Sequence, residues 1–191
     1  HGNKFIESAI KNGAKFCLTD KRNFKQNSKV CYVKDIFEYL KDLAIKKRNL
    51  YQGKVVGITG SAGKTTLKET LAYFLKKNYI ISYSQKSYNN ELGVLVSILN
   101  LNLNSKFSIF EIGTNNFNEI KYLTKIVKPE EIFITNIQST HLENFKTKKN
   151  IALEKSDIFI SKFNSVRNRL YLNISNEFEN YIYKRAKNEK K

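Results

Sequence analysis

A glycine-rich stretch, TGSAGKT, combines residue types that bind phosphate groups. Gly60 and Gly63 allow the backbone to bend so that several N–H groups face one anion. Lys64 can reach the β- and γ-phosphates of a nucleotide, and the hydroxyl of Thr65 can bind Mg²⁺. The common P-loop signature has a glycine five residues before Gly63, where this chain has Ile58. The spacing therefore indicates either a variant phosphate loop or an ordinary glycine turn.

Three other side chains that could do chemistry lie far along the chain. Glu111 stands in the apolar run FSIFEIG, where a buried carboxylate needs a metal ion or a lysine partner. His141 is a loop residue that either binds a metal ion or is simply solvated, although Mg²⁺ prefers oxygen ligands. Lys155 shares a helical stripe with Ile151 and Ile158, so its stem is expected to be buried. Its amine either reaches water or, when neutral, captures carbon dioxide as an anionic carbamate.

The segments around these residues alternate between strands and helices. We predict strands at 54–59, 79–84, 107–113, 131–137 and 169–174, and helices at 65–77, 94–101, 118–127, 148–163 and in the tail. This order predicts an α/β fold with a mostly parallel sheet and crossover helices. Ligands bind such sheets beyond the carboxyl ends of the strands. The glycine loop, Glu111 and the loop with His141 are therefore expected to meet at one edge.

The first part of the chain has a different pattern. A helix is predicted at 5–14, short strands at 15–19 and 29–33, and a helix from Asp35, its N-cap, to Leu50. The strong strand signal at 54–59 then begins a new alternation of strands and helices. We therefore divide the chain into a small α/β piece, residues 1–50, and a P-loop ATPase-type domain, residues 51–191.

The composition limits the possible partners. The net charge of +17 over 191 residues would attract nucleic acid, but the lysines are scattered and no RNA-binding or zinc-finger motif appears. Compositional bias is the simpler explanation, so nucleic acid binding is not the favoured reading. No apolar run approaches the roughly 20 residues that span a bilayer. Cys17 and Cys31 are expected to be buried, reduced thiols. We expect a cytoplasmic monomer and, because the chain contains no Met, a piece of a longer protein.

Together these motifs resemble those of the Mur ligases, the ATP-dependent amide-forming enzymes of peptidoglycan synthesis. The family's loop has the form T-G-S/T-x-G-K-T/S, which matches this chain and accounts for Ile58. SYNNELGV, EIGTNNFNEI and THLENF resemble the branch that joins D-alanyl-D-alanine to a UDP-N-acetylmuramoyl tripeptide. The resemblance implies that residues 1–50 end a UDP-binding first domain and that residues 51–191 form an incomplete central ATP-binding domain. By the same resemblance, the C-terminal ligase domain of the family is expected to lie outside these 191 residues.

The resemblance also implies roles for individual residues. ATP is expected to contact Gly60, Ser61, Ala62, Gly63, Lys64, Thr65, Thr66 and, on the adenine side, Asn173. Mg²⁺ is expected to be held by Thr65, Glu111, His141 and a carbamylated Lys155. The expected catalytic residues are Lys64, His141 and Lys155. Asn89 and Asn90 are expected to face the muramoyl substrate. Leu95 and Asn118 depart from the family pattern, which usually has proline and often has glycine there.

The implied reaction has two steps. The tripeptide carboxylate attacks the γ-phosphate of ATP, and the amine of D-alanyl-D-alanine then displaces phosphate from the acyl phosphate. Other readings remain: a Mur-type ligase that adds one amino acid, a relative of folylpolyglutamate synthase, a basic nucleotide- or nucleic-acid-binding module, and an inactive copy. The loop SYNNELGV argues against the first two.

Overall fold

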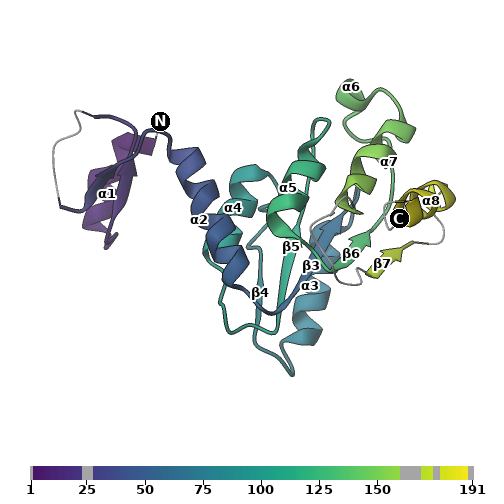
Figure 1. Cartoon of the computed structure of the whole chain (residues 1–191), viewed down its shortest axis with the longest axis horizontal. Helices are drawn as coiled ribbons and strands as arrows, with labels where there is room; N and C mark the ends of the chain where they lie inside the picture. The colour runs from purple at the N-terminus through teal and green to yellow at the C-terminus, as the bar shows by residue number, and fades with distance from the viewer. Residues whose placement is uncertain (1, 23–27, 160–168, 174–176, 189–191) are drawn as a thin grey trace. The chain divides into compact units, whose positions relative to one another are not determined.

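The computed structural model describes residues 2–22, 28–159, 169–173 and 177–188 (Figure 1). The chain forms two compact units, His1–Leu43 and Ala44–Lys191. The division falls within helix α2 (Ile36–Leu50), earlier in the chain than the predicted boundary after residue 50. The assignment of these parts to two domains of a ligase stays a prediction.

The first unit contains a small parallel pair of strands. A 3-10 turn η1 (Gly2–Phe5) and helix α1 (Ile6–Lys11) precede strands β1 (Cys17–Thr19) and β2 (Val30–Tyr32). The Asp35 carboxylate accepts hydrogen bonds from the N–H groups of Phe37 and Glu38, at 2.8 and 3.1 Å, which confirms the predicted N-cap of α2. Both cysteines are free thiols, but Cys31 is exposed and Cys17 only half-buried, so the expectation of burial was wrong.

The second unit carries the predicted alternation. Its elements are β3 (Lys54–Thr59), α3 (Lys64–Leu75), β4 (Ile81–Tyr83), α4 (Glu91–Leu99), β5 (Phe107–Glu111), α5 (Glu119–Val127), β6 (Glu131–Ile134), α6 (Leu142–Phe145), α7 (Lys148–Ser156), η2 (Asp157–Phe159), β7 (Arg169–Leu172) and α8 (Glu179–Asn188). The strand order is β4-β5-β3-β6-β7, and every neighbouring pair is parallel. This confirms the α/β fold with a parallel sheet.

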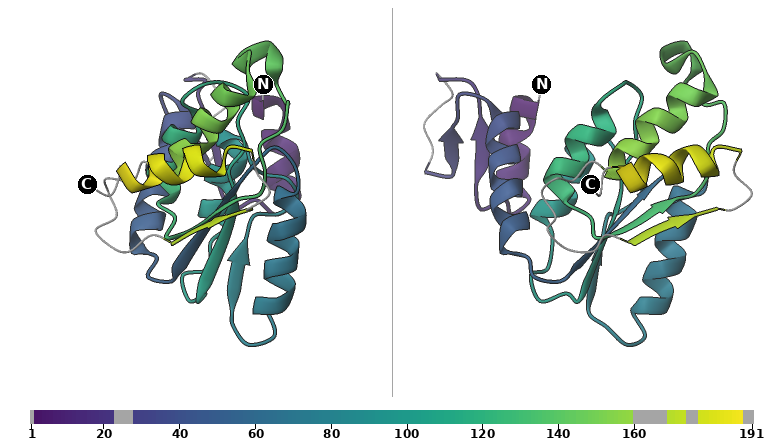
Figure 2. Two further views of the ribbon diagram at one scale, coloured as in Figure 1. Left: turned by 90° about the vertical axis from the view of Figure 1, so that its right-hand side faces the viewer. Right: turned by 45° about the vertical axis from the view of Figure 1, so that its right-hand side comes forward.

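Helices cover both faces of this sheet (Figure 2). Val56 and Ile58 of β3 and Ile109 of β5 pack with Ala72 of α3 on one face. Gly57, whose side faces away from α3, lies so close to Pro129 that an added Cβ would come within 2.8 Å of the proline ring. Because side chains alternate along a strand, Glu111 falls on the same face as Ile109 and therefore points toward α3.

Three local features differ from the sequence prediction. Helix α4 begins at Glu91, earlier than predicted, because the Asn90 side chain accepts from the N–H of Gly93 at 2.9 Å and caps it. Helix α6 was not predicted. Helix α7 ends at Ser156 and continues only as η2, whereas the predicted helix ran to residue 163. The last part of that prediction, from residue 160, lies outside the described residues.

Among the described helices, none combines the length and the apolar character needed to cross a membrane.

Candidate active site

The turn between β3 and α3 is built for close backbone contacts. Gly60 has a φ of 146° and Gly63 a φ of 79°, conformations that favour glycine. A Cβ on Gly60 would lie 1.9 Å from the Thr135 hydroxyl, so a side chain cannot be accommodated there. The turn runs directly into the first N–H groups of α3, which have no partners within the helix. This geometry is that of an anion-binding loop at a helix N-terminus.

Asn136, at the end of the neighbouring β6 segment, fixes the shape of this loop. Its backbone carbonyl accepts from the Ser61 N–H, and its side-chain carbonyl accepts from the Ala62 N–H, each at 3.0 Å. The Ser61 hydroxyl in turn accepts from the Gln138 N–H at 2.9 Å. Asn136 lies within the predicted strand at 131–137, and the sequence pattern gave it no role. The structure shows that it holds the phosphate loop.

Lys64 lies across the loop. Its amine donates to the carbonyls of Gly60 at 2.8 Å and Ser61 at 3.4 Å. Burial lowers the pKa of Lys64, and the negative charge of Glu111 partly opposes that shift. The side chain therefore sits in the position from which a lysine can reach phosphate oxygens bound to the loop.

Thr65 and Glu111 meet beside the loop. The Thr65 hydroxyl donates to Glu111 Oε2 at 3.1 Å, and the Glu111 side chain is fully buried. Its Oε1 forms an ion pair with the amine of Lys68, at a distance of 3.0 Å. The geometry of this contact is not that of a hydrogen bond, and Oε1 has no other hydrogen-bond donor among the described residues. The lysine partner that the sequence left open is therefore present. The other oxygen, Oε2, lies beside the Thr65 hydroxyl, and together they offer the hard oxygen ligands that Mg²⁺ prefers.

Lys155 is buried on the apolar stripe of α7, with 3% of its surface exposed. This confirms the expectation that the stem of Lys155 is buried. Burial, together with the positive charge of Lys64, lowers the pKa of Lys155 to about 7, although Glu154 acts in the opposite direction. Near neutral pH, Lys155 therefore supplies a substantial fraction of neutral amine.

Glu154, which sequence analysis missed, joins α7 to the loop before α5. Its carboxylate accepts from the N–H groups of Asn118 at 2.8 Å and Ile120 at 2.9 Å, and from the Thr114 hydroxyl at 3.3 Å. Asn118 has a φ of 69°, a conformation that asparagine tolerates better than most residues, so the departure from the glycine usual in the family is accommodated. Burial raises the pKa of Glu154. These hydrogen bonds hold the loop before α5 against α7.

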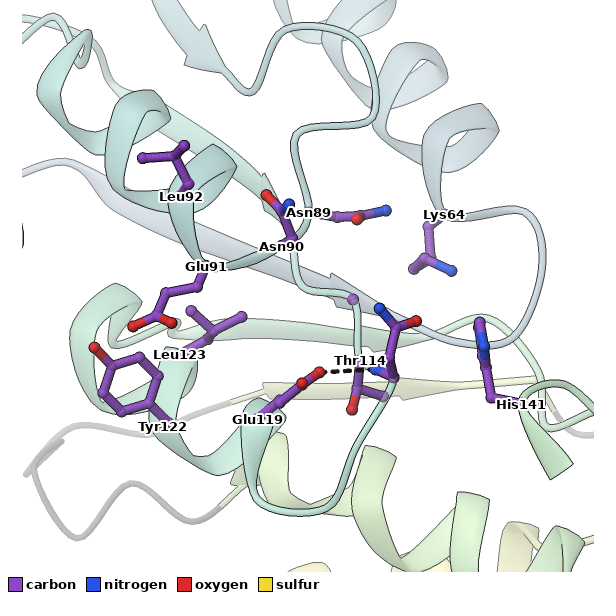
Figure 3. A pocket seen from close by; sticks show the side chains of 12 residues that line it. Lys64, Asn89, Asn90, Glu91, Leu92, Thr114, Glu119, Tyr122, Leu123 and His141 are labelled. Carbon is purple, nitrogen blue, oxygen red and sulfur yellow. Dashed lines mark hydrogen bonds between the residues drawn. The ribbon is translucent and has the colours of Figure 1, made fainter. Parts of the chain in front are cut away.

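A pocket of about 280 Å³ opens next to Lys64 (Figure 3). It is lined by Lys64, Asn89, Asn90, Glu91, Leu92, Gly113, Thr114, Asn115, Glu119, Tyr122, Leu123 and His141. The structure therefore brings three of the predicted segments together: the phosphate loop, the loop with the two asparagines and the loop that carries the histidine. Thr114, Asn115 and Glu119 were not predicted, although they lie in the motif EIGTNNFNEI that the sequence singled out.

The individual predicted residues differ in how firmly they are held. The Asn89 carbonyl accepts from the N–H of Gly113 at 2.8 Å, and an added Cβ on Gly113 would lie 2.9 Å from the Asn89 side chain. His141 has a φ of 54°, and its ring, 44% exposed, lies 3.8 Å from Glu143. Asn173 follows β7 and is exposed at the same edge of the sheet. Their roles toward a substrate, metal ion or adenine stay predictions.

In the described part of the chain, no cluster of three or more His, Cys, Asp or Glu side chains is placed to hold a metal ion. The oxygen atoms at hand are those of Thr65 and Glu111. A metal ion at this place would need further ligands from bound phosphates, water or a modified side chain.

The UDP-N-acetylmuramoyl-tripeptide--D-alanyl-D-alanine ligase of Rickettsia prowazekii is 35% identical to this chain over 188 residues, which cover 98% of the chain and 41% of that relative. The enzyme of the same name from Borreliella burgdorferi is 39% identical over 134 residues, 70% of the chain and 28% of the relative. The chain thus spans about two fifths, or less, of the length of these relatives.

Solved structures point to the same group of enzymes as these relatives. MurF from Acinetobacter baumannii superimposes with a TM-score of 0.82 at 28% identity, covering 97% of this chain and 40% of that one. The MurF ligase of Thermotoga maritima, in complex with ADP, gives 0.80 at 29% identity, covering 98% and 43%. FolC of Escherichia coli, at 17% identity and a TM-score of 0.58, covers 81% of this chain and 46% of that one and shares the fold alone. The sequence pattern of the family described as "Mur ligase middle domain" matches residues 58–191. The chain belongs to the Mur ligase family.

Proposed function

We propose that the chain binds ATP and carries the phosphoryl-transfer step of an amide ligase, in which a UDP-N-acetylmuramoyl tripeptide is joined to D-alanyl-D-alanine. The observation that carries this proposal is the meeting of Lys64, Thr65 and Glu111 beside a glycine loop at the carboxyl edge of the sheet. The names of the relatives support the acceptor and the amine substrate. The ADP complex of the Thermotoga maritima ligase supports the nucleotide.

The residues of the chain divide the work of the first step. The loop N–H groups bind and orient the phosphates, and Lys64 neutralises charge that grows on the γ-phosphoryl group during transfer. The acceptor carboxylate approaches from the pocket lined by Asn89 and Asn90. Attack forms the carboxylate–phosphorus bond and breaks the bond to ADP, which leaves with the electron pair. D-Alanyl-D-alanine then attacks the acyl carbon and phosphate leaves.

Mg²⁺ fits the Thr65 hydroxyl and Glu111 Oε2, two hard oxygen atoms that lie 3.1 Å apart beside the glycine loop. When bound, the ion neutralises negative charge on the phosphates. His141 and Lys155 complete the proposed ligand set. For Lys155, the neutral amine attacks carbon dioxide, a nitrogen–carbon bond forms and a proton passes to water, so that a buried cation becomes an anionic oxygen ligand. A cytoplasmic location and a monomeric state stay predictions.

Binding measurements test the nucleotide site. Titration calorimetry with ATP and Mg²⁺ should show one site, and Lys64→Met should weaken binding about tenfold or more because a charged hydrogen bond to phosphate is lost. Lys77→Met, which removes an exposed lysine beyond the end of α3, is the control and should bind like the unchanged chain. Equal affinity of all three proteins would contradict the site.

Phosphate release tests the acceptor. The release of phosphate from ATP should depend on a UDP-N-acetylmuramoyl tripeptide and not on shorter muramoyl acceptors or a folate. Steeply salt-dependent oligonucleotide binding, without any response to a muramoyl peptide, would favour the binding-module alternative. Complete amide formation by the 191-residue chain alone would contradict the idea that it carries only the phosphoryl-transfer part.

A further inference from the structure

Lys68 is a buried lysine without a role in the steps above. It lies on α3, one turn after Thr65, and its side chain is fully buried. Fully buried lysines are rare unless they are paired. Here Glu111 Oε1 lies 3.0 Å from the amine, the Ser84 carbonyl accepts from it at 2.8 Å, and the Lys86 carbonyl accepts a further hydrogen bond. The Glu69 carboxylate approaches to 3.2 Å from the solvent side. The amine thus makes two hydrogen bonds to backbone carbonyls and two ion pairs with carboxylates.

Two of these oxygens belong to the loop at residues 84–90, which leads to the pocket. Lys86 in this loop has a φ of 48°, a conformation that costs free energy for a residue other than glycine and persists where its surroundings hold it. The hydrogen bond from Lys68 to the Lys86 carbonyl is such a restraint. At the far end of the loop, the Asn89 carbonyl is bonded to Gly113 and Asn90 caps α4. Lys68 therefore anchors the near end of the segment that presents both asparagines.

The third contact acts on the carboxylate of Glu111. Because the Lys68 amine lies against Oε1, the other oxygen, Oε2, is turned toward the Thr65 hydroxyl and the phosphate loop. Without Lys68 the carboxylate would lose the cation that lies against Oε1 and would keep only the Thr65 hydroxyl on Oε2. One amine thus sets both the candidate metal ligand and the loop that faces the acceptor.

We propose that Lys68 is a positioning residue that couples the metal side of the site to the acceptor side. This inference rests on the proposed function. It predicts that loss of the amine weakens metal binding and acceptor binding together while leaving the contacts of the phosphate loop with the nucleotide intact, because the partners of the Lys68 amine, Ser84, Lys86, Glu69 and Glu111, lie outside that loop.

The test compares Lys68→Met with Lys76→Met, which removes an amine bonded to the exposed Tyr83 hydroxyl at the C-cap of the same helix. Mn²⁺ affinity is measured by electron paramagnetic resonance with ATP present, ATP affinity is measured again in EDTA, and acceptor affinity is measured by calorimetry. In Lys68→Met the Mn²⁺ dissociation constant should rise about 10- to 100-fold, as for lost support of a metal ligand. Acceptor binding should weaken as well, while ATP affinity without metal should stay unchanged. Lys76→Met should change none of the three.

Hydrogen exchange of the free protein tests the loop without any ligand. Amides at residues 84–90 should exchange about tenfold faster or more in Lys68→Met, because hydrogen bonds from a charged donor are lost. If the unchanged protein failed to bind Mn²⁺ and ATP, the proposed function would be contradicted, and the exchange experiment would still decide the role of Lys68. A purely structural lysine would lower the melting temperature and leave Mn²⁺ affinity, acceptor affinity and local exchange unchanged, which would overturn the proposal.

A second variant covers the case in which Lys68→Met does not fold. Adding Glu111→Gln removes the unpaired buried carboxylate and should restore folding. The double variant is then expected to show fast exchange at residues 84–90, while Glu111→Gln alone keeps slow exchange there because Lys68 still binds both carbonyls. Slow exchange in the double variant would contradict the anchoring role.

Discussion

Lys68 and Lys155 are both buried on helices of the same unit, yet their amines meet opposite surroundings. Lys68 faces a carboxylate and two backbone carbonyls. Lys155 faces the positive charge of Lys64, and among the described residues Glu154, whose carboxylate is already bonded to three donors, is the group that acts to retain its proton. Burial alone therefore does not set the surroundings of a lysine amine. The oxygens around Lys68 hold its amine in place, whereas the surroundings of Lys155 favour a neutral amine that can react.

The largest expected difference between the two lysines is in stability. Lys68→Met should lower the free energy of unfolding by about 3–5 kcal/mol, because it leaves the Glu111 carboxylate buried and unpaired. Lys155→Met should leave that free energy unchanged or raise it at pH 7, because an apolar side chain replaces a desolvated amine. Urea unfolding followed by circular dichroism measures both. Equal losses in the two variants would contradict the comparison.

The second difference is in pH dependence. The pKa of Lys155 is about 7 in the folded chain and has its ordinary value of 10.5 in the unfolded chain, so the unfolded chain holds the extra proton between these values. The free energy of unfolding should therefore rise with pH in this window and lose this slope below pH 7. Between pH 7 and 9, in buffers free of carbon dioxide, the free energy of unfolding of the unchanged chain should rise by about 2–3 kcal/mol more than that of Lys155→Met. If the free energy of unfolding depended on pH in the same way in both proteins, the lowered pKa of Lys155 would be ruled out.

A smaller effect is expected at Glu154. Glu154→Gln should cost about 1–3 kcal/mol of unfolding free energy, because an amide cannot accept all the hydrogen bonds from Thr114, Asn118 and Ile120. It also removes the negative charge that raises the pKa of Lys155, so the pH window described above should extend below pH 7. Repeating the urea measurement across pH tests both effects. An unmoved window would show that Glu154 does not influence Lys155.

The smallest expected effect concerns only the helix that carries Lys155. The Thr147 hydroxyl accepts from the Asn150 N–H at 3.1 Å and caps α7. Thr147→Ala should cost about 1 kcal/mol of unfolding free energy and leave the pH slope of Lys155 as it is. Thermal unfolding at two pH values measures both the loss of stability and the pH slope. A change in the slope would mean that the position of α7, and not only its stability, depends on this cap.

Much of the fold follows from local sequence signals. The apolar runs around Ile58, Ile109 and Ile132 predict buried parallel strands, and the parallel order then places the glycine loop and Glu111 at one edge. The period of two along β5 turns Glu111 toward α3. Helix α6 could not be predicted because its four residues are too few to show a helical period.

The partners of the site residues are harder to predict. Lys68 stands in TTLKET, where nothing marks it as different from an exposed helical lysine. It is buried because the carbonyls of Ser84 and Lys86 come from a separate strand and loop. Glu154 and Asn136 likewise take their roles from backbone N–H groups on distant segments. Such contacts depend on the tertiary arrangement, and short-range sequence patterns carry no information about it.

The difference between the two buried lysines, and with it the proposed use of Lys155 as an oxygen ligand, is measured most directly by ¹³C NMR on the chain equilibrated with ¹³C-labelled bicarbonate near pH 8. One carbamate resonance is expected, which is lost in Lys155→Met and retained in Lys68→Met. The absence of a carbamate signal from the unchanged chain, or its persistence in Lys155→Met, would contradict the account.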